Sequence, residues 1–137
     1  VDVIVGTRGE TEEYFEDAYR FIAGLDVTQL HVFSYSERPG TQALKIDHVV
    51  APEEKHKRSQ RLLTLSDEKT QAFYVRHIGQ TMPVLMEKTK AGMPMHGFTA
   101  NYIRVEVEND PSLDNKMVDV LLGELNEDGT ALKGTIL

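Results

Sequence analysis

Hydrophobic and polar positions change their spacing along the chain, and these changes predict its elements. Residues 1–5 form a β-branched, mostly apolar run, typical of a strand covered on both faces. From Phe15 to Leu25 apolar residues recur at helical spacing, and residues 30–35 form a second apolar strand. Strand, helix and strand in this order predict one βαβ unit. One such unit cannot cover its own sheet, so we expect its edges to expose apolar surface.

The ends of two helices are marked by residues that suit helix termini. Thr11 fits the N-cap of the first helix, acidic residues follow it, and Gly24 fits its end. A second helix is predicted over residues 51–77, because Pro52 suits a first helical turn and a glycine follows at position 79.

Beyond this helix the spacing is that of strands separated by turn residues. Strands are predicted over residues 81–88, 95–108, 116–125 and 130–137, and Asp128-Gly129 predicts a hairpin. Short strands with frequent glycines favour a small, OB-like antiparallel β-barrel. The expected fold class is therefore α/β plus all-β. The βαβ unit is expected within residues 1–50, a connecting helix over 51–77 and the small barrel over 78–137.

Composition narrows the chemistry of the chain. Its 15 basic and 22 acidic residues give a net charge of −7, which argues against a uniformly basic surface. Residues 51–77 nevertheless carry six basic and four acidic side chains. The absence of cysteine excludes disulfides, thiolate zinc sites and Cys-ligated iron–sulfur clusters within this chain. No apolar run approaches the ~18 residues of a membrane span, so we expect no membrane partner.

The first residues raise a question about completeness. The sequence opens inside a strand pattern and without methionine. We therefore expect it to be a piece of a longer protein.

Two groups of ionisable residues have ordinary explanations. The acidic cluster at the first helix fits a solvated helix face in which Glu16 pairs with Arg20, and only Glu10 is placed to line a site. The five histidines lie on different elements and none has metal-ligand spacing, so no metal site is expected.

Two loops follow the carboxyl ends of the first two strands, where α/β proteins bind ligands. The turn of residues 6–9 resembles a phosphate loop but lacks its Lys-Ser/Thr pair, and a tight turn explains it as well. Residues 35–41 supply an aromatic ring, hydroxyl groups and a guanidinium, so they predict a ligand loop, with a structural turn as the alternative.

The predicted second helix begins with a basic half. This half is either a solvated face or a surface that follows a phosphate backbone together with basic and aromatic residues of the barrel. The residues concerned are Lys55, Lys57, Arg58 and Arg61 on the helix, and Lys88, Phe98, Asn101, Tyr102 and Arg104 in the barrel.

Motifs along essentially the whole chain resemble one enzyme family, in the family's order. The run Asp-Val-Ile-Val-Gly-x-x-Gly-Glu-Thr-Glu-Glu at 2–13 and His-Val-Phe-Ser-Tyr-Ser-Glu-Arg-Pro-Gly-Thr at 31–41 look like late barrel elements of the radical S-adenosylmethionine (SAM) methylthiotransferases. Residues 57–66 and 73–80 resemble the family's helix that leads into a TRAM domain, and 97–107 resembles the TRAM barrel. Thr7-Arg8, where the family usually has Phe-Pro, and Glu37 depart from the pattern.

The resemblance implies a C-terminal part of a cytoplasmic tRNA-modifying enzyme, in which residues 1–50 are a partial (β/α) barrel and residues 78–137 a TRAM domain. The motifs look most like those of the branch that adds a methylthio group to N6-threonylcarbamoyladenosine beside the anticodon. The branches that act on isopentenyladenosine and on a ribosomal protein are the alternatives. The resemblance implies SAM and two 4Fe–4S clusters in the parent enzyme, with cluster cysteines that this chain lacks. Catalytic residues are therefore not expected here.

The resemblance also implies roles for individual residues. Ile4 and Gly6 would approach the adenine of SAM, and Tyr35, Ser36 and Arg38 would face the target nucleotide. The anticodon arm of tRNA would contact Lys55, Lys57, Arg58, Arg61, Lys88, Tyr102 and Arg104. The exposed edge of the partial barrel would favour dimerisation. The alternative is a stand-alone RNA-binding or protein-interaction module without catalysis.

Overall fold

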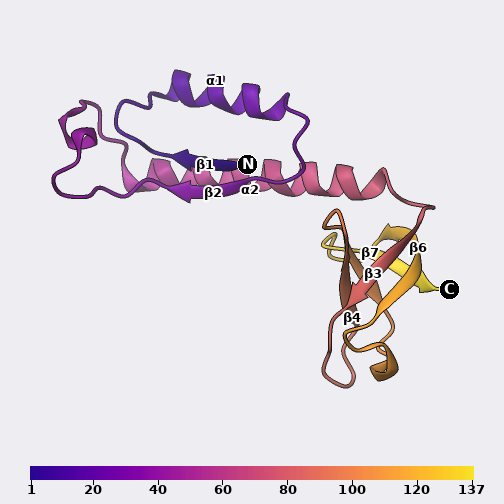
Figure 1. Cartoon of the computed structure of the whole chain (residues 1–137). Helices are drawn as coiled ribbons and strands as arrows, with labels where there is room; N and C mark the ends of the chain where they lie inside the picture. The colour runs from indigo at the N-terminus through magenta and orange to yellow at the C-terminus, as the bar shows by residue number, and fades with distance from the viewer. The chain divides into compact units, whose positions relative to one another are not determined.

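The computed structural model describes all residues, 1–137, and the chain separates into two compact units, Val1–Thr70 and Gln71–Leu137 (Figure 1). The boundary falls inside helix α2, which spans Pro52–Val75. The sequence predicted this helix as a separate connecting segment. In the structure its first part packs in the first unit and its last turn packs in the second.

The first unit contains the predicted βαβ arrangement. Strand β1 (Asp2–Val5) precedes helix α1 (Glu12–Ala23), and strand β2 (His31–Ser34) pairs with β1 in parallel, with Val3 opposite Val32 and Ile4 opposite Phe33. A short 3₁₀ helix, η1, spans Gln42–Lys45.

The predicted helix ends are confirmed at α1. The Thr11 hydroxyl accepts a hydrogen bond from the Tyr14 amide over 3.1 Å, and Gly24 is the C-cap residue. Capping satisfies main-chain groups that have no partner within the helix, so these residues fix where α1 begins and ends.

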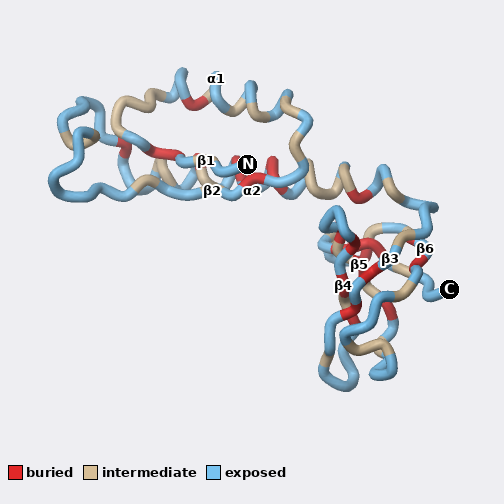
Figure 2. The backbone as a smooth tube through the Cα atoms, viewed as in Figure 1, coloured by how far each residue is buried: buried red, intermediate tan, exposed pale blue.

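Helices α1 and α2 bury their apolar residues against one face of the β1–β2 sheet. The buried cluster joins Val5 and Leu30 to Phe15 of α1 and to Leu62 and Leu65 of α2 (Figure 2). The opposite face is bare, since Ile4 is 57% exposed and Phe33 is 54% exposed. The apolar pattern of the first strand suits cover on both faces, but this chain covers only one, and the expected exposure of apolar surface is confirmed.

The second unit is the predicted closed barrel. Its strands are β3 (Thr81–Met86), β4 (Met95–Thr99), β5 (Arg104–Val107), β6 (Met117–Leu125) and β7 (Leu132–Ile136), in the order β3-β4-β5-β7-β6. A 3₁₀ helix, η2 (Pro111–Leu113), connects β5 to β6. The last turn of α2 contributes Phe73 and Tyr74 to the barrel core.

Two details of the barrel differ from the sequence-based expectation. Strands β5 and β7 are parallel, so the barrel is mixed rather than fully antiparallel. The run 95–108 is not one strand but two, because the chain turns at Ala100–Tyr102 and Tyr102 takes a left-handed conformation (φ +66°). The expected hairpin at Asp128-Gly129 is confirmed between antiparallel strands β6 and β7. Neither helix has the length and apolar character needed to cross a membrane.

Candidate functional site

A pocket of about 420 Å³ lies beside the ends of β1 and β2 and the loop that follows β2. It brings together four of the residues predicted to bind cofactor or substrate, Ile4, Tyr35, Ser36 and Arg38. Phe33 adds apolar surface, and hydroxyl groups complete the mixed lining, which consists of Ile4, Phe33, Ser34, Tyr35, Ser36, Arg38, Thr41 and Ala43. Such a lining suits a ligand with a flat ring and polar substituents.

Two polar groups at this pocket have no partner within the chain. The Arg38 guanidinium forms no hydrogen bond or ion pair, while the Arg38 carbonyl accepts a hydrogen bond from the Thr41 hydroxyl over 2.9 Å. The Tyr35 hydroxyl is buried and also lacks a hydrogen-bond partner. Arg38 is exposed, so its guanidinium is solvated and free to pair with an anion, whereas the Tyr35 hydroxyl is a buried polar group left unpaired.

Gly6 does not line the pocket. It has a φ of +80°, and a β-carbon placed there would lie 2.3 Å from Cγ of Lys55. The lysine stem therefore crosses the glycine at close range, and its Nζ donates a hydrogen bond to the Tyr35 carbonyl over 3.2 Å. Glycine is required here for the packing of Lys55, and this lysine is held against the ligand loop.

Arg8, which the sequence did not single out as a site residue, ties the loop after β1 to the loop after β2. Its Nε donates to Glu37 Oε1 over 2.7 Å, and its Nη1 donates to the carbonyl of Leu44 over 2.8 Å. The ionic hydrogen bond lowers the pKa of Glu37 and raises that of Arg8. The one sequence signal for this contact was that both residues follow carboxyl ends of adjacent parallel strands.

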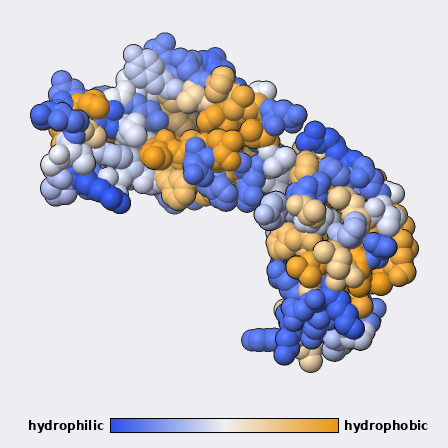
Figure 3. All heavy atoms as spheres, in the orientation of Figure 1, coloured by the Kyte–Doolittle hydropathy of each residue, from blue (hydrophilic) through white to orange (hydrophobic).

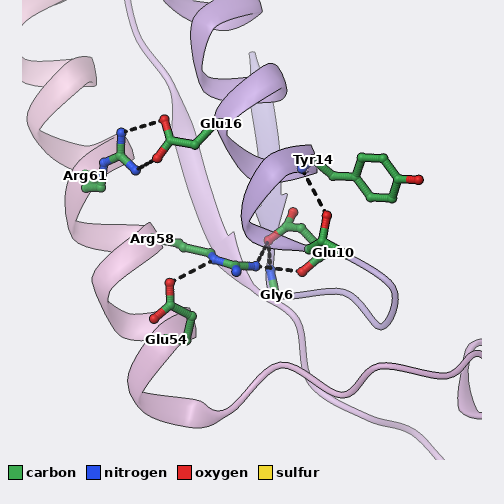
Figure 4. A network of polar contacts seen from close by, with 8 residues as sticks. Gly6, Glu10, Tyr14, Glu16, Glu54, Arg58 and Arg61 are labelled. Atoms are coloured by element: carbon green, nitrogen blue, oxygen red, sulfur yellow. Dashed lines mark hydrogen bonds and ion pairs between the residues drawn. The ribbon is translucent and has the colours of Figure 1, made fainter.

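Arg58 is buried, with 4% of its surface exposed, and its contacts lie within the first unit. Its Nη1 donates to the carbonyl and to the carboxylate of Glu10, each over 2.9 Å, and its Nε donates to Glu54 (Figure 4). The same Glu10 carboxylate accepts a hydrogen bond from the Gly6 amide over 3.0 Å. Glu10 thus connects the β1–α1 loop to α2.

Arg61 is also paired within the unit. Its guanidinium binds the carboxylate of Glu16 (Figure 4). The same guanidinium lies over the rings of Phe15 and Tyr19. The expected Glu16–Arg20 pair was wrong, because Glu16 reaches α2 and Arg20 instead binds Asp17 over 2.6 Å. The hydrogen bond from Arg61 lowers the pKa of Glu16. Of the four basic residues at the start of α2, Lys57 is the one that is exposed and without an ion pair or hydrogen bond.

The three barrel residues predicted to contact RNA lie at its surface. Lys88 is exposed beyond β3, Tyr102 is 79% exposed in the β4–β5 turn, and Arg104 donates to the Thr130 hydroxyl over 3.3 Å. Arg104 is the register partner of Phe98, which in turn is opposite Leu85. These partners form a cross-strand row on the outside of the barrel.

A polar network lies next to this row, on β4, on β5 and in the turn after β6. Glu106 Oε2 accepts a hydrogen bond from Asn126 Nδ2 over 2.9 Å and lies 3.0 Å from His96 Nε2. These contacts, chiefly the one from Asn126, lower the pKa of Glu106. Asn126 also accepts hydrogen bonds from the amides of Thr130 and Ala131, so it holds the hairpin turn.

The residues present do not fit an iron–sulfur cluster. The chain has no cysteine, and no three His, Asp or Glu side chains are grouped to hold a metal ion. A larger cavity of about 790 Å³ lies in the barrel unit, beside Met93, Pro94 and Glu108, and none of the predicted site residues lines it.

Comparison with known proteins relates the chain to enzymes that modify tRNA. The threonylcarbamoyladenosine tRNA methylthiotransferase MtaB of Bacillus subtilis is 34% identical over 123 residues, which is 87% of this chain and 27% of that protein. The chain belongs to the tRNA methylthiotransferase family, as the motifs predicted. No protein-family model matches the sequence.

Relatives with a second specificity are similarly close. The tRNA-2-methylthio-N(6)-dimethylallyladenosine synthase of Aliarcobacter butzleri is 32% identical over 99% of this chain, and that of Yersinia pestis is 33% identical over 99%. The chain spans 31% and 29% of the lengths of these two proteins. Sequence identity therefore establishes the family, and the substrate has to be argued from the site.

Proposed function

We propose that this chain is the part of a cytoplasmic tRNA methylthiotransferase that receives the target nucleoside and contacts the anticodon arm of tRNA. The observation that carries this proposal is the pocket at the ends of β1 and β2, whose lining combines Arg38, a cation without an ion pair, with aromatic and hydroxyl-bearing residues. Parallel α/β units bind ligands at this end of their strands.

The substrate we infer is N6-threonylcarbamoyladenosine. Its adenine ring suits the aromatic surface of Phe33 and Tyr35, and its carboxylate suits the guanidinium of Arg38. The exposed Ser36 offers a hydroxyl group for a hydrogen bond to the threonyl or carbamoyl group. A dimethylallyl group has no polar atom that would use these contacts. The relative from Bacillus subtilis carries the threonylcarbamoyl specificity in its name.

Binding of anticodon-arm RNA hairpins to the full chain tests this substrate. The hairpins carry threonylcarbamoyladenosine, dimethylallyladenosine or adenosine at the position 3′ of the anticodon. We expect the first to bind most tightly and to lose its advantage in Arg38→Gln. Arg20→Gln, which removes an exposed guanidinium on α1, is the matched control. Equal binding of the three hairpins would overturn the assignment of the substrate.

The cofactor chemistry of the family requires groups that this chain does not supply. In an enzyme of this family, one 4Fe–4S cluster with SAM would supply a radical and a second cluster would supply sulfur, and this chain has no cysteine to hold either cluster. Ile4 offers apolar surface to the adenine of SAM. The space beside Gly6 is filled by the side chain of Lys55, so Gly6 offers no such surface. Neither residue performs a chemical step in this proposal.

For the tRNA contact, we propose Lys57, Lys88, Tyr102 and Arg104. They combine three cations with one exposed ring, which is the combination that backbone contact and base stacking require. Lys55, Arg58 and Arg61 are held by contacts within the first unit and are left out of this set. Affinity for tRNA should therefore fall as salt rises, because phosphate contacts release counterions. Salt-insensitive binding to a protein instead would favour an interaction module.

The bare face of the β1–β2 sheet supports one further element of the proposal, which is self-association. Ile4 and Phe33 expose apolar surface there, and hydrophobic atoms are visible on the surface of this unit (Figure 3). Because both residues also line the pocket, self-association through this face and ligand binding would exclude one another. Exposed apolar faces and strand edges favour pairing with another chain. Sedimentation velocity should show a dimer that dissociates in Ile4→Lys, with Tyr14→Lys on α1 as the control. A strictly monomeric chain would contradict dimerisation.

A further inference from the structure

The loop that carries Arg38 places an acidic residue directly before it. Glu37 and Arg38 are adjacent, and both are exposed in the loop after β2. A free carboxylate at Glu37 would attract the Arg38 guanidinium and repel an anionic ligand from it. A pocket that uses Arg38 to bind an anion therefore needs a second cation for Glu37.

Arg8 is this second cation. Its Nε lies 2.7 Å from Glu37 Oε1, and the two side chains are 20% and 39% exposed, so the pair is partly shielded from water. A guanidinium stays charged at any physiological pH, and the bond keeps Glu37 ionised and engaged. Arg38 is left without an ion pair, as the pocket requires.

The same side chain also holds the far end of the loop. Arg8 Nη1 donates to the carbonyl of Leu44 over 2.8 Å and to that of Ile46 over 3.4 Å. In addition, the Gly9 amide donates to the His48 carbonyl over 2.9 Å. The segment between Glu37 and Ile46, which includes Arg38, is therefore fixed at both ends from the β1–α1 loop.

We propose that Arg8 is a positioning residue which withdraws Glu37 from Arg38 and so keeps the Arg38 guanidinium available for an anion in the pocket. The anion is a carboxylate of the nucleoside or a phosphate of the RNA backbone. The proposal rests on the proposed function for the identity of the ligand, and on the geometry of the two loops for the action of Arg8.

The decisive comparison is between Arg8→Ala and the double variant Arg8→Ala/Glu37→Gln. Removing Arg8 frees the carboxylate, so we expect binding of the threonylcarbamoyladenosine hairpin to weaken roughly two- to fivefold at low salt. Neutralising Glu37 in that background should restore most of the affinity. A loss that came from loop packing alone would persist in the double variant, because the contacts to Leu44 and Ile46 are missing from both.

One control separates the charge of Arg8 from its shape, and a second distinguishes a carboxylate of the nucleoside from a phosphate of the RNA backbone. Arg8→Lys keeps the charge and should bind nearly as well as the unaltered chain. The adenosine hairpin distinguishes the anions: an effect of Arg8→Ala on the modified hairpin alone identifies the carboxylate, and an equal effect on both identifies a phosphate.

A second measurement does not depend on RNA. The side-chain NMR signal of Arg38 should shift in Arg8→Ala, as Glu37 pairs with it, and return in the double variant. An unshifted Arg38 signal, or unrescued binding in the double variant, would overturn the role of Arg8. If no hairpin binds the unaltered chain but the signal behaves as expected, the proposed function fails and the positioning role stands.

Discussion

Arg58 and Glu10, 48 residues apart, are joined through a single guanidinium nitrogen that donates to both the main-chain carbonyl and the carboxylate of Glu10, each over 2.9 Å. The contact fastens the start of α1 to α2 inside the first unit. Arg58, which was predicted from the sequence to contact RNA, is therefore part of the internal structure of the first unit.

Replacing Arg58 should therefore affect stability more than RNA binding. Arg58→Met leaves the Glu10 carboxylate without its buried partner, and we expect a loss of about 2–4 kcal/mol in the free energy of unfolding. Lys57→Met, one residue away on the exposed face, should change it by less than ~0.5 kcal/mol. Urea denaturation followed by the circular dichroism of the helices measures both. Equal effects would show that the Arg58–Glu10 contact does not hold the unit.

Lys57 is the complementary case, since it is exposed and free of ion pairs. Lys57→Glu should weaken binding of the anticodon-arm hairpin and lower the dependence of affinity on salt by roughly one phosphate contact. Arg20→Glu produces the same change in net charge on α1 and controls for general repulsion. The Lys57 contact is ruled out if the two variants weaken binding to the same extent.

Tyr102 presents its ring from a turn that requires a left-handed backbone. Tyr102→Asn removes the ring but tolerates this conformation, so it tests stacking without new strain. We expect a loss of about 1–3 kcal/mol in binding free energy for unpaired RNA. Tyr102→Phe should retain most of the affinity because it keeps the aromatic face. Fluorescence anisotropy with a labelled hairpin distinguishes these results, and unchanged binding of Tyr102→Asn would exclude stacking.

The Glu106 network predicts acid sensitivity of the barrel. The pKa of the Glu106 carboxyl is lowered below 4.5 in the folded chain. As the pH falls, the unfolded chain therefore binds the proton first. The stabilisation is complete above about 4.5, the value for an unperturbed glutamate, and is lost as the pH falls through the lower folded value. Glu106→Gln should be less stable at neutral pH and should show a weaker loss of stability on acidification. Hydrogen exchange of the β5 amides between pH 3 and 7, with Glu108→Gln as the control, reports on this difference.

Local signals predicted most of the secondary structure, and the misses have a local cause. Thr11 and Pro52 mark helix starts because their chemistry acts on neighbouring residues. The turn at Ala100–Tyr102 contains neither glycine nor proline, so the run 95–108 was interpreted as one strand. Tyr102 adopts a positive φ there, a conformation that the sequence gives no reason to expect of a tyrosine.

The candidate site was predictable where its residues belong to one loop. Tyr35, Ser36 and Arg38 line the pocket because the loop follows a parallel strand, and that rule needs no tertiary information. The partners of charged residues were not predictable in the same way. Arg8 and Glu37, both departures from the family's pattern, were noted separately, and only the structure shows that they bind each other.

The continuity of α2 determines where the chain can be divided. Cutting at residue 50 would remove Leu62 and Leu65 from the core of the first unit, and a barrel beginning at residue 78 would lack Phe73 and Tyr74. The two units share an uninterrupted helix in place of a linker, so exchange of one unit between related enzymes would succeed only with a junction inside that helix, near Thr70.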